Sequence, residues 1–184
     1  MVIYPMGKKY NFFLILVIVI IVGAAGYYWY NLNSHDKYYE SYKMQLNSTN
    51  KSMELCESAL GTIMLSMLGQ DISTTNITAD LNGGNSSTTA AISYSEDMLK
   101  YSNTDSEKEY AEILIKQSKE MKKFIKLTNI LSTSTKNTEK FKDIMKQLNE
   151  VKTQEQTYQN DLNKIRTKDP EFSNHLDQIE KAMN

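Results

Sequence analysis

The chain has 184 residues, of which 40% are hydrophobic and 23% charged, and its formal net charge is −1. That length allows one domain with a modest core, and a near-zero net charge gives no long-range field to attract nucleic acid. Arginine, the usual bidentate reader of phosphate, occurs once, as Arg166. The one cysteine, Cys56, excludes an internal disulfide and a thiolate metal cluster. We therefore expect no nucleic-acid partner.

Residues 12–30 read FFLILVIVIIVGAAGYYWY and carry no charged side chain. As a helix these nineteen residues span about 28 Å, close to the hydrocarbon thickness of a bilayer. The stretch ends in aromatic residues of the kind that favour a membrane interface: Tyr27, Tyr28, Trp29 and Tyr30. The pattern predicts a single transmembrane helix, with the lipid bilayer as its partner.

Lys8 and Lys9 stand before this stretch, whereas the first charges after it are mixed. The positive-inside bias places residues 1–11 in the cytoplasm as a short tail and residues 31–184 outside. An alternative stays open. The lysines, the apolar core and the small residues Gly23–Ala25 also fit a cleaved secretory signal, which would release the rest as a secreted helical protein.

The sequence after residue 30 indicates an all-α fold. It lacks the alternation of apolar and polar residues that is typical of strands, and the whole chain has only two Pro and seven Gly. We expect an antiparallel bundle of three long helices and a short C-terminal fourth. The first long helix, residues 36–68, has a seam at alternating steps of three and four, apolar at eight of nine positions. The seam consists of Tyr39, Tyr42, Leu46, Thr49, Met53, Cys56, Leu60, Ile63 and Met67.

Residues 69–87 are rich in Ser, Thr, Asn and Gly, so they predict a polar, flexible link with a break at Gly83–Gly84. Residues 88–131 return to a helical pattern, in one helix or two. Thr104 and Glu107 fit a capping box, which would start a new helix there, but one continuous helix would better match its long neighbours.

A short turn is expected at residues 132–135, followed by a helix over residues 136–167. Its seam is apolar at seven of eight positions: Phe141, Ile144, Leu148, Val151, Glu155, Tyr158, Leu162 and Ile165. Asp169 and Pro170 then predict the cap and first position of a last helix. That helix would pack through Phe172, Leu176, Ile179 and Met183.

Two further features are candidate sites. Cys56 lies in the first seam, where it is either a small core residue or, if two copies pair there, an intermolecular disulfide. Four lysines share one helix face and could form a patch for an anionic surface, although nearby acidic residues dilute their charge. They are Lys116, Lys119, Lys123 and Lys126.

No nucleophile motif, phosphate loop or cofactor fingerprint occurs, so we expect no enzyme, no cofactor and no catalytic or metal site. Glu171 and His175 share a helix face but lack the further ligands that a bundle metal site needs. The sequence therefore predicts a membrane-anchored extracytoplasmic bundle that acts by protein or cell-surface contacts, including self-association through the seams. The alternative is a ligand-binding ectodomain that signals through a separate membrane partner.

Overall fold

The computed structural model describes residues 8–69, 74–134 and 138–183, without the side chains of residues 8–18, Ala25, Tyr28, Thr74 and Thr138. Within these ranges the chain forms five helices and no strand, which confirms the all-α fold class. They are α1 (Lys8–Met67), α2 (Thr74–Tyr101), α3 (Asp105–Ser134), α4 (Thr138–Lys168) and α5 (Pro170–Met183).

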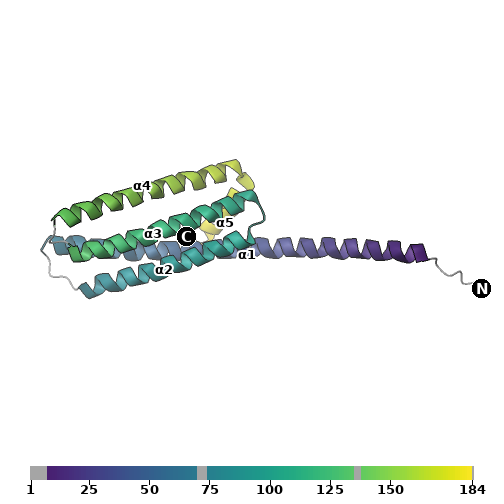
Figure 1. The fold of residues 1–184 in the computed structure, drawn as a ribbon, viewed down its shortest axis with the longest axis horizontal. Helices are drawn as coiled ribbons and strands as arrows, with labels where there is room; N and C mark the ends of the chain where they lie inside the picture. Colours follow the sequence, from purple (N-terminus) through teal and green to yellow (C-terminus); the bar gives the residue numbers. More distant parts are fainter. Residues whose placement is uncertain (1–7, 70–73, 135–137, 184) are drawn as a thin grey trace, which may run out of the picture.

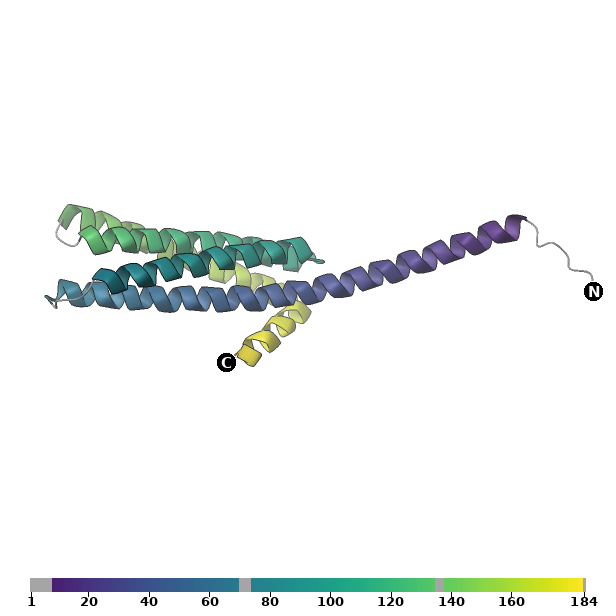
Figure 2. The same ribbon diagram turned by 90° about the horizontal axis from the view of Figure 1, so that it is seen from below.

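Helix α1 is a single rod of 60 residues, about 90 Å long at the usual rise per residue. Its N-terminal half projects from the molecule, and its C-terminal half lies in an antiparallel bundle with α2, α3 and α4 (Figure 1). The short α5 crosses α1 near the point where α1 leaves the bundle (Figure 2). The bundle therefore has four long helices, one more than the sequence pattern predicts.

Within the part of the chain that the structure describes, no helix is long and apolar enough to cross a membrane. The transmembrane helix predicted over residues 12–30 lies partly outside that part, because the side chains of residues 12–18 are not described. It stays a prediction.

The predicted flexible link at residues 69–87 is wrong from Thr74 onward, where α2 begins. The buried positions of α2 recur at steps of four and three, as in a packed helix: Ile77, Leu81, Gly84, Thr88, Ala91, Ser95 and Met98. Four of the seven are Gly, Thr, Ala or Ser, so the period is invisible to a search for large apolar residues. Residues 70–73 lie outside the described ranges.

Small residues also explain why α2 lies so close to α1. The hydroxyls of Ser52 and Thr88 are 2.6 Å apart, and each lies within 3.1 Å of the Gly84 carbonyl oxygen. One hydroxyl can donate to the carbonyl while the other donates to the first hydroxyl, so every polar group in this buried contact has a partner. A Cβ at Gly84 would already be in van der Waals contact with Cys56 Sγ at 3.4 Å, the Ser52 carbonyl oxygen at 3.6 Å and Ile125 at 3.7 Å, so a larger side chain would run into these neighbours.

The capping box divides residues 88–131 into two helices. The Glu107 amide donates to Thr104 Oγ1 at 3.1 Å, and the Glu107 carboxylate accepts from the amides of Asn103 at 2.6 Å and Thr104 at 3.2 Å. The cap on α5 is also confirmed, because the Phe172 amide donates to Asp169 Oδ1 at 3.1 Å and Pro170 opens the helix. These local signals depend on a few adjacent residues, and the structure forms them as predicted.

Helix α3 continues to Ser134, so the turn predicted at residues 132–135 is helical there, and residues 135–137 lie outside the described ranges. The α4 seam is confirmed, because all eight predicted positions are buried or half-buried. The core has two parts. One lies near the crossing of α1 and α5 and is rich in tyrosine, and the other lies toward the far end of the bundle and is aliphatic.

Candidate functional site: an apolar groove between α1 and α4

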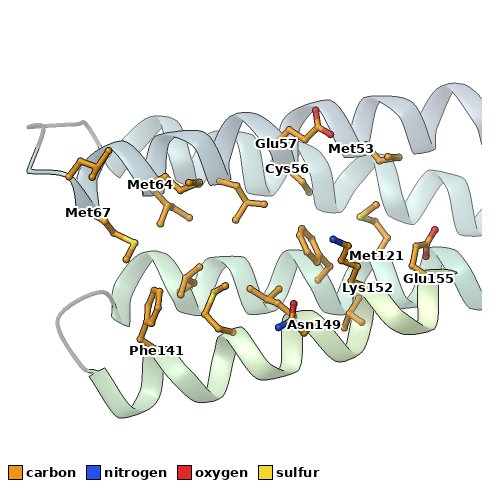
Figure 3. Close-up of a pocket in the computed structure, with 18 residues that line it drawn as sticks. Met53, Cys56, Glu57, Met64, Met67, Met121, Phe141, Asn149, Lys152 and Glu155 are labelled. Carbon is orange, nitrogen blue, oxygen red and sulfur yellow. The ribbon is translucent and has the colours of Figure 1, made fainter. Parts of the chain in front are cut away.

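An open groove of about 740 Å³ runs along the end of the bundle that is far from the projecting half of α1. Helices α1 and α4 form its walls, and Met121, Phe124 and Leu131 of α3 line it between them (Figure 3). Large apolar side chains, including five methionines, make up most of the lining. Methionine adapts its shape readily, so such a surface can accept varied partners.

The α1 wall is a second seam on the same helix, beside the one that packs on α2. Its members recur at steps of four and three: Met53, Glu57, Leu60, Met64 and Met67. The predicted single seam is therefore divided between two faces. Cys56 and Ile63 are buried, whereas Met53 and Met67 are 45% and 47% exposed and Met64 is 65% exposed. Helix α2 covers only one of the two apolar seams of α1, so a second neighbour is needed to cover the other.

The α4 wall has the same spacing: Phe141, Met145, Leu148, Lys152 and Glu155. Phe141 faces the end of the groove where Met67 lies, and Glu155 lies at the end where Met53 lies (Figure 3). The two walls are therefore antiparallel, with Glu57 of one at the level of Lys152 of the other.

Near the crossing of α1 and α5, the space between α1 and α4 is occupied by α5. The Glu180 carboxylate accepts a hydrogen bond from the Tyr42 hydroxyl of α1 at 2.5 Å and from Arg166 Nη1 of α4 at 2.8 Å. Arg166 also pairs with Asp177 of α5. Burial is the main reason that the pKa of Tyr42 is raised far above 10.0, so its hydroxyl stays protonated and donates.

Aromatic contacts strengthen the same junction. The ring of Phe172 in α5 lies 6.2 Å from that of Tyr38 in α1 and 5.2 Å from that of Tyr110 in α3. The Tyr38 hydroxyl donates to the Glu107 backbone carbonyl at 2.9 Å, which ties α1 to the start of α3. The gap between α1 and α4 is thus filled by α5 where α5 crosses α1. Toward the opposite end of the bundle the same gap is open and forms the groove.

The structure places Cys56 inside the bundle, 2% exposed, with its sulfur toward Gly84 of α2. Burial raises the pKa of the thiol, which keeps it protonated and unreactive. The core interpretation therefore fits, and the predicted disulfide between two copies is not favoured, because Cys56 would have to leave its contact with α2.

The other predicted site residues lie on the surface. Lys116, Lys119, Lys123 and Lys126 are exposed along α3, and Lys123 lies 3.8 Å from Glu120. Tyr27, Trp29 and Tyr30 are 60–70% exposed on the projecting half of α1, and the Tyr28 side chain lies outside the described part. None of these residues borders the groove.

His35 of α1 and His175 of α5 come together, with ring centroids 5.4 Å apart. His175 Nδ1 lies 3.1 Å from the backbone carbonyl oxygen of Glu171, and this carbonyl is a hydrogen-bond acceptor for the ring. Among the residues that the structure describes, no three His, Cys, Asp or Glu side chains gather as metal ligands. The pair contributes ring packing between α1 and α5.

The sequence reasoning missed the groove, although a signal for it was present. The positions of the α1 wall have a heptad spacing of their own, but the predicted seam takes only Met53, Leu60 and Met67 from it, together with Cys56 and Ile63, and leaves out Glu57 and Met64. Comparison of the chain with family models, with curated proteins and with solved structures finds no match. Any function must therefore be argued from the groove and the sequence.

Proposed function

We propose that this chain is a single-pass membrane protein that holds its helical bundle outside the cytoplasm and binds another protein chain through the groove between α1 and α4. The observation that carries the proposal is the groove itself, an apolar, methionine-rich surface with an α1 wall that no described helix covers. A contiguous exposed apolar surface with polar residues at its edges is a common feature of protein interaction sites. The role is that of an adaptor, assembly subunit or envelope component.

The anchor rests on the sequence. Residues 12–30 are apolar, uncharged and long enough to cross a bilayer, and Lys8 and Lys9 favour a cytoplasmic N-terminus. Helix α1 continues without interruption from Lys8 to Met67, so the same rod would carry both the anchor and one wall of the groove. The absence of any catalytic motif in the sequence supports a binding role over an enzymatic one.

Geometry argues against the bilayer as the occupant of the groove. Met53, the member of the α1 wall nearest the anchor, follows Tyr30 by 23 residues, which in a helix is about 35 Å. Lipid in the membrane that holds the anchor would not reach that far along the rod. A second protein chain can, and an antiparallel pair of apolar seams is a surface suited to helices.

A second candidate is a small apolar ligand held between the helices, as in a sensing ectodomain. The volume of about 740 Å³ lies within the usual range for ligand sites and favours this candidate. Such sites normally also place several polar groups toward the ligand. Three of the four polar side chains in the lining, Glu57, Asn149 and Lys152, are exposed, and the half-buried Glu155 already accepts a hydrogen bond from Gln117, so they offer few enclosed contacts.

The experiment is photo-crosslinking in intact cells from a photoreactive residue at Met64 in the groove, with one at Lys119 on the outer face as the matched control. We expect a discrete protein adduct from position 64 only, lost when Met145→Glu places a charge in the groove. Met145 is 39% exposed, so this substitution leaves the core intact. A small-molecule adduct alone would select the second candidate, and equal adducts from both positions would contradict a role for the groove.

A further inference from the structure

We infer that the protein chain in the groove is a second copy of this chain, with α1 of each copy packed antiparallel on α4 of the other. The inference rests on the proposed function, because it uses both the membrane anchor and the groove. It also specifies the partner. The two surfaces that would meet are the α1 wall and the α4 wall defined above.

The two walls match each other in spacing, and at one position they carry opposite charges. The α1 wall runs forward along the chain from Met53, and the α4 wall runs backward from Glu155. In these directions both walls have successive steps of four, three, four and three residues, so their members fall opposite one another in pairs. Met64 then falls opposite Met145, and Met67 opposite Phe141. Glu57, the one charged member of the α1 wall, falls opposite Lys152 of the α4 wall. The other charged member of the α4 wall, Glu155, falls opposite Met53 and accepts a hydrogen bond from Gln117 of its own chain. This is the pattern of two helices that pack on one another.

Within one chain these walls face each other but do not meet, because α5 lies in the gap between α1 and α4 near the crossing. The bonds from Tyr42 and Arg166 to Glu180 hold α5 in place, and Phe172 fills the space between the helices. Each chain therefore presents two complementary surfaces that its own fold keeps apart. A second copy can satisfy both of them.

Anchoring in one bilayer gives the two copies the required arrangement. Both have α1 pointing the same way, so a twofold axis along the helices places α1 of one copy beside the antiparallel α4 of the other, at equal height. Glu57 then meets Lys152 twice, once across each seam. The rival arrangement, α1 against α1 in parallel, would place Glu57 near its own copy, and like charges would oppose it.

The test is disulfide trapping in membranes that contain two differently tagged chains, both with Cys56→Ala. One chain carries Glu57→Cys and the other Lys152→Cys, and an oxidant is added. We expect a covalent dimer that contains both tags. The matched control replaces Lys152→Cys by Lys119→Cys on the outer face and should yield no such dimer. Both target residues are exposed, so neither substitution disturbs the core.

Charge reversal at the Glu57–Lys152 position gives a second test. The dimer is then trapped by a disulfide between Met64→Cys on one chain and Met145→Cys on the other, and the fraction of chains in the covalent dimer is measured. Glu57→Lys or Lys152→Glu alone should weaken pairing about two- to fivefold per seam, the usual effect of an exposed ion pair. The double reversal should restore it. An unchanged trapped fraction in both single variants would overturn the predicted register.

Placing Glu57→Cys and Lys152→Cys on one chain distinguishes the remaining outcomes. A disulfide that forms only within that chain would show that α1 closes on its own α4, and would overturn the inference. If no disulfide forms between copies and the photo-crosslink from Met64 captures a different protein, the second copy is not the occupant of the groove. The proposed function would still stand. No protein adduct of any kind would contradict both.

Discussion

The hydroxyl groups of Ser52 on α1 and Thr88 on α2 lie 2.6 Å apart in the interior of the bundle. Such a contact needs the two helix backbones to approach closely, and Gly84 beside it provides the space. This contact is one of the buried contacts that place α2 on α1, and α2 in that position leaves the other seam of α1 facing the groove. The bundle depends on it at a place where the sequence offers no large apolar residue.

Enlarging Gly84 should destabilise the bundle. Gly84→Leu would drive side-chain atoms into Cys56 and the Ser52 carbonyl, since the first added carbon already meets them at 3.4 and 3.6 Å. Overpacking of this kind costs about 1–3 kcal/mol. The control is Gly61→Leu on the exposed face of α1, where nothing lies within 4 Å. Thermal unfolding of the full chain, followed by circular dichroism, should show a lower Tm for the first variant only.

The start of α3 should depend on its capping box. Thr104→Ala removes the acceptor of the Glu107 amide, and loss of such a cap costs about 1 kcal/mol. Thr104→Ser keeps the oxygen and should retain most of the stability. If unfolding of the alanine and serine variants gave the same Tm, the bond at 3.1 Å would contribute nothing measurable.

The cap on α5 should make stability depend on acidic pH. The bond from the Phe172 amide is the largest of the causes that lower the pKa of Asp169 below 3.8, so the charged form favours folding. This contribution is fully present above the unfolded-state pKa and is lost as pH falls through the lower folded-state value. Asp169→Ala should therefore cost about 1 kcal/mol at pH 7 and less near pH 3. Urea unfolding at the two pH values measures the difference, and an equal cost at both would contradict it.

Helix α5 should detach when Arg166 is lost. Arg166→Ala removes the bonds to Glu180 and Asp177, and hydrogen bonds of charged groups contribute about 1.5–3 kcal/mol each when partly buried. We expect faster amide hydrogen exchange across residues 170–183 with little change in α2. Lys164→Ala is the control, because the ion pair of Lys164 with Asp161 is exposed and worth about 0–1 kcal/mol. Equal exchange of α5 in both variants would show that Arg166 does not hold it.

Features governed by neighbouring residues were predictable from the sequence. The capping box at Thr104, the cap at Asp169 and the α4 seam all follow from local chemistry and helical period, and the structure has each of them. Helix α2 was not predictable in this way. Its buried face is made largely of Gly, Thr, Ala and Ser, whose burial is stabilised by contact with α1, not by their own hydrophobicity.

The groove was missed for a related reason. Sequence periodicity shows that α1 has apolar positions but not which of two adjacent faces each position occupies, and that depends on where α2 and α3 pack. The same uncertainty affected Cys56, whose predicted role between copies required the face that the structure buries against Gly84. The position of α2 leaves Cys56 buried at the inner edge of the groove and Met53 exposed on its α1 wall.

The most direct measurement is labelling of intact cells with a membrane-impermeant maleimide, using Met64→Cys in the groove and Lys119→Cys on the outer face, both with Cys56→Ala. If the bundle lies outside the cytoplasm and a protein fills the groove, position 119 should label quickly and position 64 slowly, with the difference abolished by Met145→Glu. Met64 is 65% exposed in the single chain, so its slow labelling requires an occupant. Equal labelling of the two positions would contradict an occupied groove, and no labelling of either would contradict the extracytoplasmic location.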